Sequence, residues 1–92
     1  MAYRQWAEVT DRTHRPEQAA VILVLIQDLG AGGWFVRGYD RTGRETTETW
    51  HGGLPSAREW AVAEYSADTI GAWHDIPDET QDPVRYALRK RR

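Results

Sequence analysis

The chain has 92 residues, of which 40% are hydrophobic and 28% charged, and it contains no cysteine. This length suits a single domain, residues 1–92, and the lack of cysteine excludes disulfides, thiol catalysis and cysteine-ligated metal sites. The longest apolar run, Ala19–Ile26, is far shorter than the ~20 residues of a membrane-spanning helix. With no visible secretory signal, we expect a cytoplasmic protein without a membrane partner.

The net charge of −2 conceals an uneven distribution. Residues 64–82 hold six acidic side chains and no Lys or Arg, whereas residues 83–92 hold five basic side chains and no acid. We expect residues 89–92 to be a disordered basic tail. Because Arg suits bidentate recognition of phosphates, Arg89 and Arg91 are candidate binding residues. The alternative is that the basic end only neutralises the acidic stretch.

In chain order, the first predicted strand is Trp6–Val9, followed by a polar loop at Asp11–Pro16. The next segment, Ala19–Asp28, is ambiguous, because Pro16 before it and Gly30 after it suit a helix. Its β-branched residues favour a strand, which we prefer. Since both alternating sets of its side chains are apolar, we expect this strand at the middle of a sheet, covered on both faces.

A hairpin is predicted after the glycine-rich break at residues 30–33. Its strands, Trp34–Tyr39 and Arg44–Trp50, are joined by a type I turn that requires a positive φ at Gly43. Counting outward from this turn pairs Tyr39 with Glu45 and Trp34 with Trp50, which stacks two aromatic rings across the strands. One face then carries Trp34, Val36 and Trp50, and the other carries Phe35, Arg37 and Tyr39.

A helix is predicted at Pro55–Ser66, with an apolar stripe that should pack on the sheet. Ser56 and Glu59 have the spacing of a capping box with Ser56 as the N-cap. If the helix begins earlier, Pro55 lies in its first turn instead.

Residues 69–76 suit a further strand, and Asp82 followed by Pro83 predicts the N-cap and first residue of a short helix that ends near Lys90. The predicted fold is therefore α+β: a small antiparallel sheet of three to five strands, with one helix packed on a face and a short C-terminal helix.

The five tryptophans are an unusual feature beside a single phenylalanine. Trp34, Trp50 and Trp60 fall where the sheet and its helix should meet, so we expect them in the core. Trp6 and Trp73 are less constrained and are the two that remain available for a binding surface.

No residue pattern here is typical of an enzyme. The histidines lack the spacing of a helical metal site, and His51 and His74 would form a site only if the fold joined them with Asp75 or Glu48. The stretch Gly30–Gly33 lacks the spacing of a phosphate-binding loop, and a strand rather than a helix follows it. We therefore predict no catalytic residues, no metal and no cofactor.

Residues 33–66 combine a strand, the Asp40–Gly43 turn, a strand ending at Trp50 and a helix. This order resembles the AP2-like arm-binding domains of tyrosine recombinases, and it is similar to small double-stranded-RNA-binding-like domains. In the recombinase family the sheet face away from the helix enters the major groove. The resemblance implies a nucleic-acid-binding face made of Phe35, Arg37, Tyr39 and, on the turn, Arg41.

We therefore predict a non-catalytic small binding module, a protein-interaction or regulatory accessory protein with a protein partner or a homodimer. The alternative is a nucleic-acid-binding accessory protein that uses the Arg/Tyr sheet face and the Arg-rich C-terminus. The candidate binding residues are Phe35, Arg37, Tyr39, Arg41, Trp73, Arg89 and Arg91.

Overall fold

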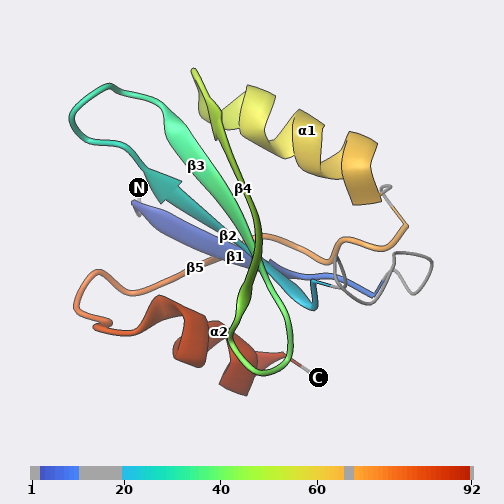
Figure 1. Cartoon of the computed structure of the whole chain (residues 1–92). Helices are drawn as coiled ribbons and strands as arrows, with labels where there is room; N and C mark the ends of the chain where they lie inside the picture. Colours follow the sequence, from blue (N-terminus) through green and yellow to red (C-terminus); the bar gives the residue numbers. More distant parts are fainter. Residues whose placement is uncertain (1–2, 11–19, 66–67, 92) are drawn as a thin grey trace.

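The computed structural model describes residues 3–10, 20–65 and 68–91. A five-stranded antiparallel sheet in the order β4-β3-β2-β1-β5 lies between two helices (Figure 1). The predicted α+β fold is confirmed, and among the described residues no helix combines the length and apolarity needed to cross a membrane. The elements are β1 (Arg4–Glu8), β2 (Ile22–Gln27), β3 (Trp34–Tyr39), β4 (Glu45–His51), α1 (Leu54–Tyr65), β5 (His74–Asp75) and α2 (Pro83–Lys90).

The ambiguous apolar segment forms β2, the central strand of the sheet. Leu23 and Leu25 point into the layer beneath α1, whereas Ile22 and Val24 point into the layer beneath α2. All four side chains are fully buried. The preference for a strand is confirmed, because only a strand sends alternate apolar side chains to two opposite covered faces. The start of the predicted segment, at Ala19, lies outside the described residues.

On one face of the sheet, α1 packs on β3 and β4. The helix begins at Leu54, so Pro55 lies in its first turn and Ser56 is not the N-cap. The prediction that this helix packs on the sheet is confirmed, and small side chains on its inner face allow a close approach. The buried residues of this cluster are Val9, Ala20, Leu23, Leu25, Trp34, Val36, Ala57, Ala61 and Tyr65.

On the opposite face, α2 packs on β1 and β2. Asp82 caps the helix as predicted, since its Oδ1 accepts a hydrogen bond from the Arg85 amide at 3.0 Å, and Pro83 is the first helical residue. The prediction of a disordered tail from residue 89 is wrong at its start, because Arg89 and Lys90 form the last turn of α2. Arg92 lies outside the described residues. The buried residues of this cluster are Trp6, Ile22, Val24, Tyr39, Ile76 and Ala87.

The last strand is shorter than predicted. Residues 69–76 run beside β1, with a bridge from Ile70 to Val9, but only His74 and Asp75 form the strand β5. The sheet therefore ends in a short strand on this side and in the longer β4 on the other.

The turn between β3 and β4 has the predicted form. Gly43 has φ of 88°, and Asp40 Oδ1 accepts hydrogen bonds from the backbone amides of Thr42 and Arg44. The Thr42 hydroxyl also donates to this carboxylate and is the main reason that the pKa of Asp40 is lowered. Tyr39 pairs with Glu45 as expected.

Beyond this pair, the predicted register fails by one residue. A β-bulge lies between Gly38 and Tyr39, so that Phe35 pairs with Trp50 and Trp34 pairs with His51. A bulge adds one residue to one strand and thereby reverses which face the following side chains occupy. The predicted pairing of Trp34 with Trp50 is therefore wrong, and Trp50 lies on the α2 side of the sheet.

The division of the tryptophans between core and surface therefore differs from the prediction. Trp34 is 4% exposed and lies in the core, as expected. Trp6, which was predicted to be available for a binding surface, is only 6% exposed and belongs to the core beneath α2. Trp60 and Trp73 are half-buried. Trp50, predicted as a core residue, is 49% exposed.

Candidate functional site

Cross-strand neighbours on the α2 side of the sheet form rows that continue from one strand to the next. In one row, Ile26 of β2 pairs with Phe35 of β3, which in turn pairs with Trp50 of β4. We call these three residues the open row, since Trp50 is half exposed and the other two are only half-buried. On this face, within the described part of the chain, α2 packs on β1 and β2 and leaves the Trp50 end of β4 without a helix over it, whereas α1 packs on the opposite face (Figure 1).

The Trp50 ring is held in place although half of it faces solvent. Its Nε1 donates a hydrogen bond to Asp28 Oδ2 at 3.2 Å, and Asp28 Oδ1 accepts from the amides of Gly30 and Ala31. A Cβ at Gly33 would collide with the Trp50 ring, so the ring uses space that only glycine leaves open. The glycine-rich segment, predicted only as a connection, therefore also positions Trp50.

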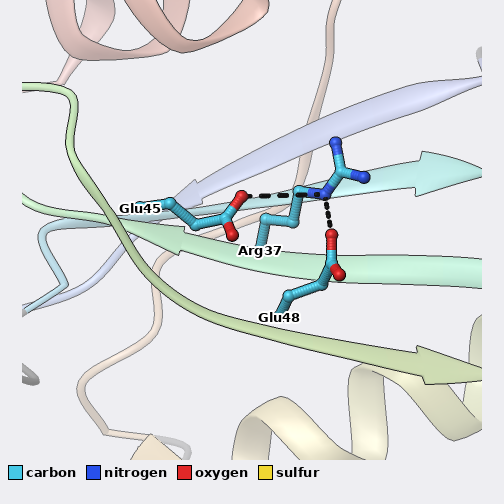
Figure 2. Close-up of polar contacts among 3 residues, drawn as sticks. All are labelled: Arg37, Glu45 and Glu48. Atoms are coloured by element: carbon cyan, nitrogen blue, oxygen red, sulfur yellow. Dashed lines mark hydrogen bonds and ion pairs between the residues drawn. The ribbon is translucent and has the colours of Figure 1, made fainter.

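Arg37 lies beside the open row between two carboxylates. Its Nε is 2.6 Å from Glu48 Oε2 and 3.9 Å from Glu45 Oε1 (Figure 2), and its guanidinium carbon is 5.1 Å from the centroid of the Phe35 ring. Burial alone lowers the pKa of Arg37, but the hydrogen bond and charge of Glu48 outweigh this effect and raise it overall. The positive charge of Arg37 is thus balanced locally rather than offered to a phosphate.

Tyr39 does not continue the open surface. Its side chain is 8% exposed and belongs to the core cluster beneath α2, and this burial is the main cause of its raised pKa. The face implied by the resemblance to arm-binding domains is therefore interrupted: Phe35 and Arg37 adjoin each other, whereas α2 covers Tyr39. Arg41 is exposed on the hairpin turn.

The other predicted binding residues lie on a different part of the surface. Trp73 and Arg91 line an open cleft of about 780 Å³ between β5 and α2, and the Arg58 guanidinium lies 5.9 Å from the Trp73 ring. Arg89 instead lines a second hollow of about 430 Å³ between α2 and the hairpin turn. Of the predicted binding residues, only Phe35 belongs to the open row, with Arg37 beside it. Trp73, Arg89 and Arg91 line the two hollows next to α2.

The two histidines singled out in the sequence do not meet. His51 belongs to β4 and His74 to β5, which form opposite edges of the sheet. The His51 Nε2 is 2.8 Å from the Thr49 hydroxyl, and the His74 ring lies against Trp6 with 4.9 Å between centroids. Among the described residues, no group of three His, Cys, Asp or Glu side chains is placed to hold a metal ion.

Trp50 is the surface residue that sequence reasoning missed. Its position depends on the bulge in the β3–β4 pairing, and an alternating pattern carries no sign of a single inserted residue. Ile26 was missed as well, because it was expected beneath a continuous cover on both faces of the central strand.

A scan against protein-family models and searches of curated proteins and of solved structures found no match to this chain. The resemblance of residues 33–66 to arm-binding domains therefore stays a prediction.

Proposed function

We propose that this chain is a non-catalytic protein-binding module and that the open row is the centre of its binding surface. The observation that carries the proposal is Trp50, an aromatic side chain that is half exposed and yet fixed by Asp28 and Gly33. Tryptophan, tyrosine and arginine dominate the binding energy of protein interfaces, and they act best when they are already held in the bound orientation.

The size of the exposed area supports this role. A tryptophan side chain buries roughly 150–250 Å² when fully covered, so the exposed half of Trp50 represents roughly 100 Å². At about 25 cal/mol per Å², covering it contributes about 2 kcal/mol, which is the scale of an interface hot spot. Phe35 and Ile26 extend the apolar area across the neighbouring strands.

The test is whether the affinity of a partner depends on Trp50 in particular and not on any exposed apolar side chain. A tagged chain is used to isolate partners from the cells that make it, and each purified partner is titrated against the wild type, Trp50→Ala and Val62→Ala. Val62 is the matched control, because it is 42% exposed and lies on α1, away from the open row.

We expect Trp50→Ala to weaken binding by about tenfold or more, and Val62→Ala to leave it within about twofold. Circular dichroism establishes that both variants fold. Equal affinity of a partner for wild type and Trp50→Ala would overturn the proposal. Light scattering of the chain alone tests the homodimer form of the proposal, in which the partner is a second copy.

A second candidate is nucleic-acid binding, now centred on α2 rather than on the sheet. The observation in its favour is the exposure of Arg85, Arg89 and Lys90 on that helix. This candidate expects an affinity for DNA or RNA that falls steeply with salt, and that is reduced in an Arg89→Gln, Lys90→Gln double variant. Fluorescence anisotropy with labelled duplexes and single strands at low salt measures it, and no binding to any of them would exclude it.

A further inference from the structure

The open row ends at a free sheet edge. β4 is the outermost strand in the order β4-β3-β2-β1-β5, and no other strand of the described residues pairs with its outer side. It contains seven residues, and the pairing from Thr47 to His51 is regular beyond the bulge. A strand of this kind presents unpaired backbone groups on which another extended segment can form hydrogen bonds.

The opposite edge of the sheet is protected in comparison. β5 has only two residues, His74 and Asp75, and Pro77 follows them closely. Short edge strands and proline are common devices that prevent further pairing. β4 has seven residues and no proline, and the bulge in its pairing lies before Thr47. The part of β4 from Thr47 to His51 therefore lacks these two devices.

The side chains at the free edge favour one kind of added strand. Glu48 and Trp50 are exposed and lie two residues apart on the α2 side of β4. Residues of an added strand would stand opposite them at Cβ distances of about 4.5–5.5 Å, where unlike charges and apolar contacts are stabilising. A basic residue suits the position opposite Glu48, and an apolar residue two positions away suits Trp50.

The charge around this edge points in the same direction. Asp28 accepts a hydrogen bond from Trp50, and Arg37 beside the open row lies between Glu45 and Glu48, so three carboxylates accompany one cation. Figure 2 shows that Arg37 approaches these glutamates from the neighbouring strand β3. The surplus of carboxylates over cations therefore favours an added strand that carries positive charge.

We propose that β4 binds an extended segment of another protein as an additional strand, and that this segment carries basic and apolar residues two positions apart. This inference rests on the proposed function and specifies its partner. A second copy of the chain is disfavoured as the occupant, because its own β4 would bring two glutamates and no lysine or arginine. The symmetric register centred on Glu48 would place two carboxylates directly opposite each other.

The experiment selects binders to the full-length chain from a library of random linear peptides displayed on phage. We expect the selected peptides to contain Lys or Arg two positions from an apolar or β-branched residue. The affinity of the corresponding synthetic peptides should fall by about tenfold or more in Glu48→Lys and also in Trp50→Ala. Glu59→Lys, a charge reversal on an exposed helical residue, is the matched control and should leave the affinity unchanged.

Hydrogen exchange of the bound chain separates strand addition from other contacts. We expect amides of β4 to gain protection on peptide binding while those of α1 do not change. Peptides that need Trp50 but carry no basic residue, or that leave the β4 amides unprotected, would overturn the added strand and leave the proposed function standing. Peptides that ignore both Glu48 and Trp50 would overturn the inference and count against the open row itself. Concentration-dependent dimers that protect β4 without peptide would show that the occupant is a second copy.

Discussion

The two faces of the sheet are built from the same strands and yet differ in how completely they are covered. An α-helix is about 10 Å across and strands lie about 4.8 Å apart, so one helix covers roughly two strands. On one face, α1 packs on β3 and β4. Ile70 and Trp73 pack against the same core near β1 and so cover the rest of this face. On the other face, α2 packs on β1 and β2. Beside it, the end of β3 and β4 that carries Phe35 and Trp50 remains half open.

Exposed aromatic surface therefore arises here from incomplete coverage of a sheet rather than from a dedicated loop. On the closed face, Leu23, Leu25 and Val36 of β2 and β3 are fully buried aliphatic side chains. On the half-open face, the same strands carry the open row and the Arg37 ion pairs. The difference between the faces can be measured as a difference in stability and in local opening.

The largest expected effect is a difference in unfolding free energy between substitutions at two adjacent residues of β2 that point to opposite faces. Leu25 is fully buried beneath α1, whereas Ile26 is half-buried in the open row. We expect Leu25→Ala to lower the free energy of unfolding by about 2–5 kcal/mol and Ile26→Ala by less than about 2 kcal/mol. Urea denaturation measures both, and equal losses would contradict the assignment of one closed and one half-open face.

The next effect concerns the support of Trp50. In Gly33→Ala the new Cβ would meet both the Trp50 ring and the His51 carbonyl oxygen, the latter at 2.5 Å. We expect a loss of about 1–3 kcal/mol in unfolding free energy and a shifted NMR signal of the Trp50 indole N–H. Gly52→Ala is the control, because a Cβ there meets nothing within 4 Å. An unmoved indole signal in Gly33→Ala would show that this glycine does not position the ring.

A smaller effect concerns the N-cap of α2, and it shows whether the packing of this helix on the sheet depends on that cap. Asp82→Ala removes the acceptor for the Arg85 amide and is expected to cost about 1 kcal/mol, whereas Asp82→Asn keeps an acceptor and costs less. Hydrogen exchange should become faster in α2 while α1 is unaffected, because the helices lie on separate faces. Equal acceleration in both helices would mean that the two faces open together.

The smallest effect is the coupling between Arg37 and Glu48. Their side chains are 31% and 43% exposed, and exposed ion pairs contribute about 0.2–1 kcal/mol. A double-mutant cycle with Arg37→Met and Glu48→Gln should give a coupling energy in this range that decreases with added salt. A coupling well above this range would mean that the pair is shielded from water and that this part of the face is closed.

Much of the fold was predictable because local and tertiary preferences agree. The doubly apolar pattern of β2 indicates a central strand, and the Asp82–Pro83 pair marks the start of α2 through capping and a fixed φ. The site was less predictable. Phe35 and Arg37 were identified and are adjacent, but Tyr39 is covered, because a pattern of alternation does not say which helix crosses which strand.

By itself the sequence determined the α+β class, the two helices, the hairpin and the form of the turn closed by Gly43, and it favoured a central strand at β2. Each of these depends on hydrophobic alternation, capping or backbone conformation, which act over a few residues. Only the tertiary structure decided that a bulge turns Trp50 to the α2 side and that α2 stops short of the open row. Both depend on how strands and helices pack against each other, since a shift of one residue in pairing changes the face of every side chain beyond it.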